Sequence, residues 1–274
     1  MENYKNQLII FSKNRACQLN LLLDSIRANA NLLFDKVSVL YKAENEYTLG
    51  YEILIEKNKE INFYKENNFK IDLLRLIDDK INATTFMVDD AVFFDKITAN
   101  KSDIIQSVIN DNLIFSLRLG KNCNYSHPAN LYYTLGEHEE HGEYILFDYT
   151  KQQAGDFSYP LSTDGHIFNS RLIKELLVEI EFNNPNTLEA NLQKFVLLRT
   201  IPKNIKCFSQ SKLVSIPVNL VNNTFNNRHG LKFRMSEKEL NNRFISGDII
   251  DLNSMDFSDI NGPHKEVKYE FKRG

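Results

Sequence analysis

Two adjacent acids, Asp89 and Asp90, are the residues of this chain best suited to chemistry. They follow the apolar run Thr84–Val88 and precede the apolar run Ala91–Phe94. Carboxylates are costly to bury without a partner, so this pair needs a compensating charge. Mg²⁺ and Mn²⁺ are commonly held by one or two carboxylates together with phosphate oxygens. From the residues alone two interpretations stay open: a metal site, or an acidic pair on an exposed turn after a strand.

The elements that must position this pair alternate in the first hundred residues. Apolar runs predict strands at 7–12, 36–41, 61–65 and 84–88, and helical spacing of apolar residues predicts helices at 18–27, 47–57 and 69–80. Such alternation predicts a parallel sheet, whose sites lie at the carboxyl ends of the strands. Polar residues, most of them cations and carboxylates, lie at or just after the ends of these predicted strands: Ser12, Lys13, Arg15, Tyr41, Lys42, Glu44, Lys65, Glu66, Asp89 and Asp90.

The pattern changes after Asp95. Here we expect strands at 114–119, 144–149, 163–168 and 213–218, and helices at 170–180 and 188–198, the latter capped by Asn186 or Thr187. Ser236 and Glu239 form a capping-box pattern that opens a last helix. The Asn-rich segment 222–230 is typical of loops that become ordered on ligand binding.

No linker, repeat or low-complexity tract divides the 274 residues. We therefore predict an α/β fold with a mixed, mostly parallel sheet flanked by helices, in one domain spanning 1–274. Within it, 1–95 and 96–235 are expected to be two halves of different pattern, and 236–274 a C-terminal helix and tail.

Composition excludes several classes of protein. A net charge of −3 argues against binding nucleic acid by bulk electrostatics. No apolar run approaches the ~18 residues of a membrane span, and the first residues lack a signal-peptide pattern. We expect a cytoplasmic protein. Because no Gly-x-Gly-x-x-Gly, P-loop or Gly-x-Ser-x-Gly motif is present, dehydrogenase, NTPase and hydrolase activities are disfavoured.

Several segments, taken in order, resemble the GT-A glycosyltransferases of bacterial surface-polysaccharide synthesis. The resemblance rests on the opening Leu8–Arg15 before a Leu-rich helix, the acidic motif Val88-Asp89-Asp90, and the later stretches Phe115–Gly120 and Asp164–Phe168. Because valine replaces the first acid of a strict Asp-x-Asp motif, the pattern leaves open which acid binds the metal and which the ribose.

The resemblance implies a metal-dependent enzyme, using Mn²⁺ or Mg²⁺, that moves a sugar from a nucleotide-sugar donor to a glycan or lipid-linked glycan. It implies that 1–95 is the nucleotide-binding half and 96–235 the acceptor-side half. Asp90 would bind the metal, with Asp89 contacting metal, ribose or donor sugar, and His229 as an additional ligand. The nucleotide-sugar would be bound by Ser12, Lys13, Arg15, Tyr41, Lys42, Lys65, Asp89 and Arg228. A lipid-borne acceptor would place the enzyme peripherally at the inner face of the membrane.

An inverting transferase also needs a carboxylate that accepts the proton of the acceptor hydroxyl. Glu189 and Asp164 are the two candidates, with Glu189 favoured. Each has a structural alternative: Glu189 near a helix N-terminus meets the helix dipole favourably, and Asp164 can stabilise a turn. Two other functions remain open for the whole chain. One is a sugar nucleotidyltransferase, although its Gly-rich loop is missing after the first strand, and the other is a non-catalytic nucleotide- or glycan-binding protein.

Overall fold

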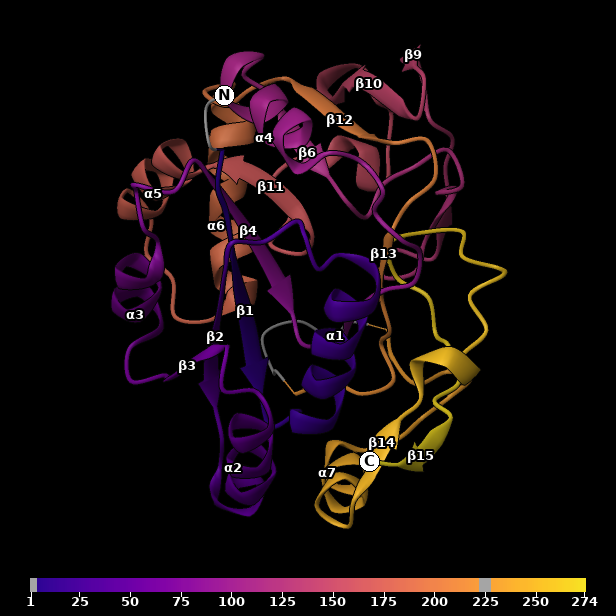
Figure 1. Ribbon diagram of the computed structural model, residues 1–274. Helices are drawn as coiled ribbons and strands as arrows, with labels where there is room; N and C mark the ends of the chain where they lie inside the picture. Colours follow the sequence, from indigo (N-terminus) through magenta and orange to yellow (C-terminus); the bar gives the residue numbers. More distant parts are fainter. Residues whose placement is uncertain (1–3, 222–227) are drawn as a thin grey trace.

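A computed structural model of the chain describes residues 4–221 and 228–274. Its centre is a nine-stranded mixed sheet with the strand order β3-β2-β1-β4-β11-β6-β12-β10-β9 (Figure 1). The strands are β1 (Asn6–Lys13), β2 (Lys36–Lys42), β3 (Asn62–Lys65), β4 (Ala83–Val88), β6 (Ile114–Ser116), β9 (Glu139–His141), β10 (Tyr144–Asp148), β11 (His166–Asn169) and β12 (Asn204–Phe208). This confirms the predicted α/β class, and both predicted halves contribute strands to the same sheet.

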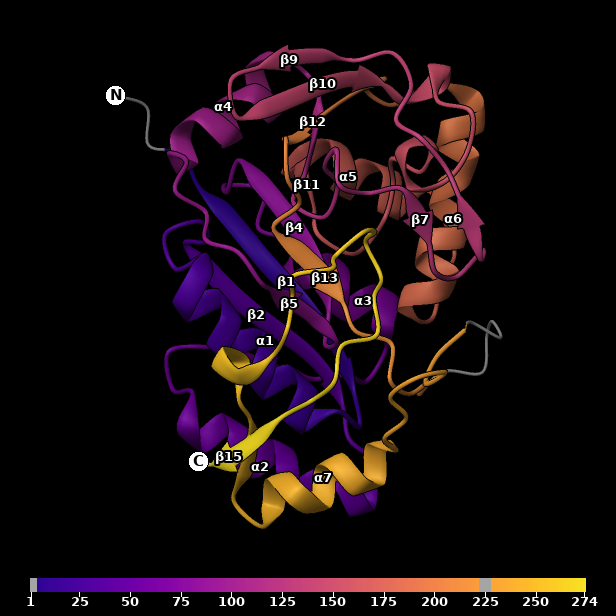
Figure 2. The ribbon, with the colours of Figure 1, turned by 90° about the vertical axis from the view of Figure 1, so that its right-hand side faces the viewer.

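Alternation along β1 creates a core on each face of the sheet. Leu8 and Ile10 belong to one buried cluster, whereas Ile9 and Phe11 belong to the other, because successive strand side chains point to opposite faces. The first cluster includes residues of α1 (Ala16–Asn29), α2 (Thr48–Lys57), α4 (Lys101–Asn110) and α7 (Glu237–Ile245); the second includes residues of α3 (Phe69–Leu76), α5 (Ser170–Val178) and α6 (Pro185–Leu198). The helices thus sandwich the sheet (Figure 2).

The direction of the strand order reverses between β1 and β4. From β1 the chain goes outward to β2 and β3, and then returns to β4 on the other side of β1. All four of these strands run parallel. In such sheets the crevice beyond the carboxyl ends of the two central strands is the usual ligand site. Here those ends carry Ser12 and Lys13 on β1, and Asp89 and Asp90 after β4.

Three small antiparallel sheets complete the fold and bring the C-terminal tail back to this crevice. They pair β5 (Ala91–Phe93) with β13 (Leu213–Ser215), β7 (Tyr125–Ser126) with β8 (Leu131–Tyr132), and β14 (Asp248–Ile250) with β15 (Phe271–Arg273). The tail pairs with β13, since Ser215 N donates to the Pro263 carbonyl and Lys265 N donates to the Ser215 carbonyl. Residues near 264–266 therefore lie close to the end of β4, although the sequence separates them widely.

Several predicted boundaries were wrong, and one matters for the site. Helix α6 begins at Pro185, because the Asn184 side chain accepts a hydrogen bond from Thr187 N and proline suits the first helical position. Neither Asn186 nor Thr187 is the N-cap, and Glu189 therefore lies beyond the first turn. Helix α3 ends at Leu76, four residues before the predicted end, and α4 and β12 were not predicted.

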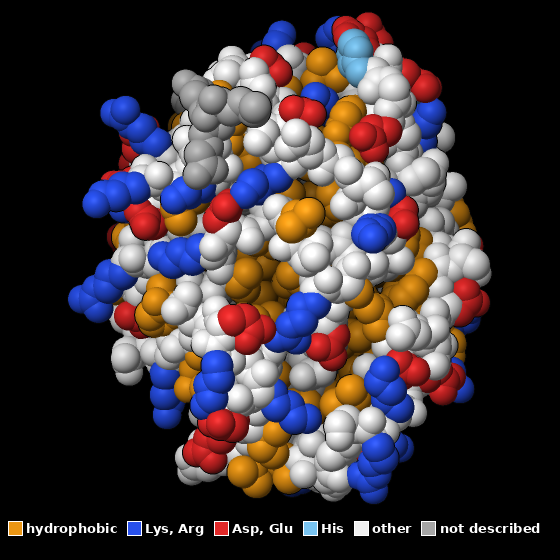
Figure 3. All heavy atoms as spheres, in the orientation of Figure 1, with side chains coloured by type: hydrophobic (Ala, Val, Ile, Leu, Met, Phe, Trp, Pro, Cys, Tyr) orange, Lys and Arg blue, Asp and Glu red, His pale blue; other side chains and the backbone are white. Residues whose placement is uncertain are grey.

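The surface agrees with the low net charge. On the face shown in Figure 3, Lys and Arg side chains are interspersed with Asp and Glu side chains. None of the helices in the described ranges is long and apolar enough to cross a bilayer.

Candidate active site

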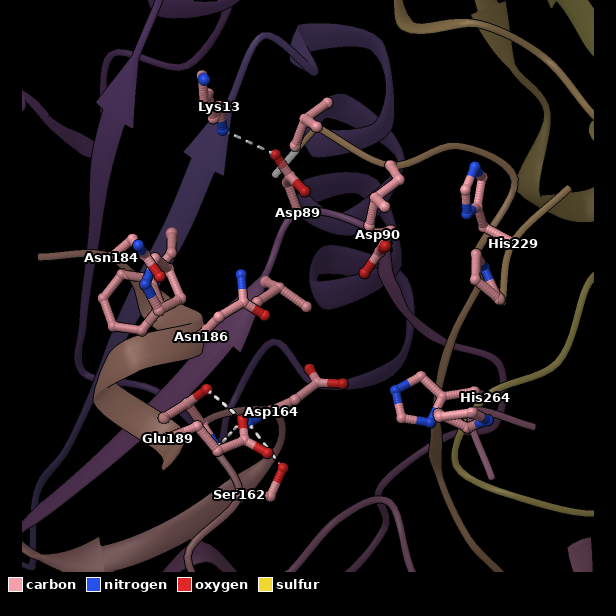
Figure 4. A pocket seen from close by; sticks show the side chains of 18 of the residues that line it. Lys13, Asp89, Asp90, Ser162, Asp164, Asn184, Asn186, Glu189, His229 and His264 are labelled. Carbon is pink, nitrogen blue, oxygen red and sulfur yellow. Dashed lines mark hydrogen bonds between the residues drawn. The ribbon is translucent and has the colours of Figure 1, made fainter. Parts of the chain in front are cut away.

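A cavity of ≈ 1030 Å³ opens beyond the carboxyl ends of β1 and β4. It brings together most of the residues predicted for the site: Ser12, Lys13, Arg15, Lys42, Asp89, Asp90, Asp164, Glu189, Arg228 and His229. Figure 4 shows Asp89 and Asp90 on one wall, and Glu189 and Asp164 on the wall across from them. We call the first wall the donor end and the second the acceptor end, after the roles expected of these residues from the sequence.

Arg15 links the two acids of the donor end. Its Nη1 atom lies 3.0 Å from Oδ1 of Asp89 and 3.1 Å from Oδ2 of Asp90. The rest of the guanidinium is held by Asn219, since Nε donates to Oδ1 at 2.8 Å and Nη2 donates to the backbone carbonyl at 2.6 Å. Arg15 was predicted to bind the nucleotide-sugar; in this structure its donors are directed to Asp89, Asp90 and Asn219.

Asp89 is fixed by its neighbours on β1. The Ser12 hydroxyl and the backbone N–H of Lys13 donate to its Oδ2 atom at 2.8 and 3.1 Å. The Ser12 hydroxyl also lies 2.6 Å from the hydroxyl of Tyr51 in α2. Burial raises the pKa of Asp89, against the opposing effect of Arg15. Asp89 thus has hydrogen-bond donors on both of its oxygens.

The carboxylate oxygens of Asp90 and Asp89 fit a divalent cation that also binds substrate. Burial raises the pKa of Asp90 to about 7 despite Arg15, and the charges of Asp89 and Asp164 add to this rise. The carboxylates are thus undercompensated by Arg15. Across residues 4–221 and 228–274, no three His, Cys, Asp or Glu side chains form a metal cluster, so His229 does not complete a protein-only site. Asp90 and Asp89 fit the mode in which Mg²⁺ or Mn²⁺ takes its other ligands from phosphate and water.

Two predicted nucleotide-binding residues, Tyr41 and Lys65, are not part of the cavity wall. Leu40 and Lys42 of β2 line the cavity, so Tyr41 points to the opposite face of the strand. There its ring stacks on Tyr51, with the ring centroids 4.8 Å apart. At the end of β3 the lining residue is Glu66, which lies 3.6 Å from Lys42 Nζ, and Lys65 is exposed. Both β2 and β3 were predicted as strands, with β2 ending one residue later than expected. The face on which Tyr41 and Lys65 lie was not predicted correctly.

At the acceptor end, Glu189 is held by Thr163. The backbone N–H and the hydroxyl of Thr163 donate to Oε2 of Glu189 at 3.1 and 2.7 Å. Burial raises the pKa of Glu189, which suits a group that must accept a proton. Asp164 lies beside it and accepts a hydrogen bond from the Ser215 hydroxyl. The structure brings both candidate bases to one wall.

Arg118 is a site residue that sequence reasoning missed. It follows β6, so its place after a strand end was the available signal. Its side chain is buried, with Nη1 donating to the Ser162 hydroxyl at 2.7 Å and lying 3.5 Å from Oδ2 of Asp164. Nη2 lies 3.8 Å from Asp156 and 3.2 Å from Nδ1 of His264. No sequence pattern points to His264, which enters the cavity wall from the C-terminal tail.

The segment 228–233 contributes Arg228 and His229 to the cavity lining and is attached to the tail by Glu266. Oε1 of Glu266 accepts from Leu231 N at 2.7 Å, and Oε2 accepts from Lys232 N and Phe233 N at 2.7 and 3.0 Å. These amides lower the pKa of Glu266, although burial opposes them. Arg228 Nη1 donates to the Tyr125 hydroxyl at 2.9 Å. Most of the predicted loop 222–230 lies outside the described residues; Arg228 and His229 are within them and line the cavity.

Comparison with known proteins finds a glycosyltransferase among the relatives. The chain is 25% identical over 254 residues to the bifunctional glycosyltransferase pgtA of Dictyostelium discoideum, covering 81% of this chain and 33% of pgtA. The chain therefore spans about a third of the length of this curated relative. No family model matches the sequence.

Among solved structures, S. aureus TarS is similar in fold. The superposition gives a TM-score of 0.49 at 14% identity and covers 77% of this chain and 36% of TarS. For TarS residues 1–349 the TM-score is 0.47 at 14% identity, with 77% of this chain and 60% of that one covered.

The chain is thus a homologue of a glycosyltransferase and has the α/β fold expected of the GT-A type.

Proposed function

We propose that this chain transfers a sugar from a nucleotide-sugar donor to a glycan or lipid-linked glycan, as one step of surface polysaccharide synthesis. The observation that carries the proposal is the pairing of two carboxylate walls across one cavity, Asp89 and Asp90 facing Glu189 and Asp164 (Figure 4). The similarity to pgtA supports the transferase class.

The residues of the donor end would bind the nucleoside diphosphate. Lys13 and Lys42 supply positive charge at this end, Arg228 lines the same cavity, and the backbone around Ser12 fixes Asp89. Asp90, with Asp89, would hold Mg²⁺ or Mn²⁺. When bound, such an ion supplies positive charge that stabilises the leaving diphosphate.

At the acceptor end, Glu189 would act as the general base of an inverting transfer. Its carboxylate accepts the proton of the acceptor hydroxyl, while the hydroxyl oxygen forms a bond to the anomeric carbon of the donor sugar. The bond from that carbon to the diphosphate breaks, and the nucleoside diphosphate leaves with the bonding electrons. Thr163 holds Oε2 of Glu189 and Tyr159 is a further hydrogen-bond partner of this carboxylate, so both residues orient it.

We further propose that the enzyme acts in the cytoplasm, peripherally at the inner face of the membrane when its acceptor is lipid-linked. Charged and apolar residues alternate in the tail around Val267 and Tyr269. Both of these side chains are buried, so they pack inside the protein and are not available to contact a membrane. We therefore expect any membrane contact to depend on the acceptor lipid.

A thermal-shift panel of nucleoside diphosphates and nucleotide-sugars, with and without Mn²⁺, tests the donor site. A ligand at a hundredfold excess over its Kd stabilises the folded state by ~2.7 kcal/mol. We expect a Mn²⁺-dependent shift for one nucleotide, lost in Asp90→Asn and retained in the control Asp95→Asn. Asp95 lies five residues further on and pairs with Lys212, outside the cavity.

Product analysis then separates the enzymatic alternatives. A glycosyltransferase releases a nucleoside diphosphate from the nucleotide-sugar, whereas a nucleotidyltransferase releases pyrophosphate from a nucleoside triphosphate. Absence of any nucleotide-dependent shift across the panel would contradict the proposed donor site.

A further inference from the structure

The two ends of the cavity differ in charge. At the donor end, the lining residues Lys13, Arg15 and Lys42 lie with the carboxylates Glu66, Asp89 and Asp90. At the acceptor end, three carboxylates (Asp156, Asp164 and Glu189) surround one guanidinium, that of Arg118. Formally, three positive and three negative groups stand at one end, and one positive and three negative groups stand at the other.

The single cation of the acceptor end is already engaged. Arg118 is 4% exposed, and both of its terminal nitrogens are directed to protein groups: Nη1 to Ser162 and Asp164, and Nη2 to Asp156 and His264. It therefore has no free pair of N–H groups with which to bind a carboxylate of a ligand side by side.

The neighbouring histidine adds no positive charge. Burial, together with the charge of Arg118, holds the pKa of His264 well below its ordinary value. His264 is thus a neutral ring against Arg118. Arg118 is thus the positive charge that lies among Asp156, Asp164 and Glu189.

Two buried atoms at this end lack hydrogen-bond partners within the described residues. They are Nε of Arg118, a donor, and Oδ1 of Asp164, an acceptor, and both residues line the cavity and are at least nine-tenths buried. A hydroxyl group can accept from one and donate to the other. Tyr159 and Asn186, which line the same end, add a phenol and an amide that also suit hydroxyl groups.

Resting on the proposed function, we propose that the acceptor end also receives the sugar of the nucleotide-sugar donor, as a subsite for a neutral, polyhydroxylated sugar that rejects sugars carrying a carboxylate. A uronic acid placed here would add a negative charge to Asp156, Asp164 and Glu189, whose neighbouring cation, Arg118, is already engaged. Like charges at close range inside a protein cost far more than in water. The diphosphate is thereby directed to the donor end.

The test compares nucleotide-sugars that differ only at C6. With the base chosen from the thermal-shift panel, isothermal titration in Mn²⁺ would measure the nucleoside diphosphate and its glucose, galactose, glucuronate and galacturonate conjugates. We expect at least one neutral conjugate to bind tenfold or more tightly than its matched uronate. In Asp156→Asn the ratio should narrow, because one of the three carboxylates is removed. Asp148→Asn, outside the cavity, is the control and should keep the ratio.

Two results would contradict these proposals. Equal or tighter binding of the uronate in each pair, while the nucleoside diphosphate still binds, overturns the charge-selective subsite and leaves the proposed function standing. Failure of the nucleoside diphosphate itself to bind removes the proposed function and this inference together. If Asp156→Asn does not fold, the ratio measured on the unaltered protein still decides the proposal.

Discussion

Arg15 reaches Asp90 through a single nitrogen, with Nη1 3.1 Å from Oδ2 of the carboxylate. The same nitrogen lies 3.0 Å from Asp89. One guanidinium therefore serves two buried acids that follow one another at the end of β4. The guanidinium also ties both acids to Asn219, which lies 204 residues after Arg15 in the chain.

Removing this guanidinium should destabilise the protein strongly. Deleting one partner of a buried ion pair typically costs 3–5 kcal/mol, because an uncompensated charge remains. We expect Arg15→Met to lower the free energy of unfolding by about that amount, measured by urea denaturation at pH 7. Arg27→Met is the control: Arg27 also contacts two acids, Asp24 and Glu60, but its side chain is 43% exposed, so a loss of only about 0–1 kcal/mol is expected. Equal losses for the two variants would show that burial of the Arg15 pairs contributes little.

Replacing Glu189 by glutamine should separate chemistry from donor binding. General-base catalysis contributes typically 10²–10⁴-fold, so Glu189→Gln should lower kcat by at least about 10²-fold and leave the Kd of the nucleotide unchanged. Because burial raises the pKa of Glu189 above its ordinary value of 4.5, activity of the unaltered enzyme should fall on acidification at a higher pH than an ordinary glutamate would give. Wild-type kcat in Glu189→Gln would exclude it as the base; Glu181→Gln, on the surface nearby, serves as the control.

The same pKa shift makes a prediction about stability. The pKa of Glu189 is higher in the folded than in the unfolded state, so its ionisation is harder in the folded protein, and stability is lost as the pH rises above the unfolded pKa. Glu189→Gln cannot ionise. It should therefore have a higher Tm than the unaltered protein at pH 8, and the difference should disappear near pH 4. A lower Tm at pH 8 would indicate that the carboxylate is stabilised by Thr163 more than burial penalises it.

The sequence predicted the parallel half of the sheet and the donor end because both depend on local patterns. Apolar runs of four to eight residues marked β1, β2 and β4, and polar residues directly after them marked the crevice. The face of a side chain at a strand end was not determined by such patterns, since it depends on where the pleat stops; hence Tyr41 and Lys65 were misplaced. Asp164 and Glu189 were found through the resemblance rather than through periodicity.

The remaining residues of the site come from contacts that no local pattern encodes. His264 reaches the cavity wall, and Glu266 reaches the backbone of residues 231–233, because the tail pairs with β13. That pairing depends on the way the last forty residues fold back over the molecule. Arg118 was hidden for a different reason: the predicted strand 114–119 extended through it, whereas β6 ends at Ser116.

Glu266 should position the segment 228–233, which carries the lining residues Arg228 and His229. In Glu266→Gln the amide NH₂ cannot accept hydrogen bonds, so at least one of the three backbone N–H groups loses its partner. Hydrogen bonds to a charged group are worth ≈ 1.5–3 kcal/mol. We expect faster hydrogen exchange at Leu231, Lys232 and Phe233 and, by displacement of Arg228, an increase in the nucleotide Kd of about tenfold with kcat little changed.

The control for Glu266 is Asp148→Asn. Asp148 also accepts a backbone hydrogen bond, from Thr150 N at 2.9 Å, but lies outside the cavity. It should change exchange only at its own turn. Unchanged exchange at residues 231–233 in Glu266→Gln would refute the positioning role.

Gly165 allows Asp164 to lie on the cavity wall, and alanine should not be tolerated there. Its φ is +80°, and a Cβ would lie 2.3 Å from Cδ2 of buried Leu213. The backbone cannot shift freely, because Gly165 N donates to the Phe86 carbonyl and its own carbonyl accepts from Leu117 N.

Gly142→Ala is the matched control: its φ is +64°, with nothing within 4 Å of the added Cβ. A non-Gly residue in this region costs ~1–3 kcal/mol, so Gly142→Ala should show this strain alone. Gly165→Ala should lose more in urea unfolding, and since Asp164 moves with it, binding of a nucleotide-sugar should weaken relative to the nucleoside diphosphate. Equal losses of stability in the two variants would mean that the contact with Leu213 relaxes without cost.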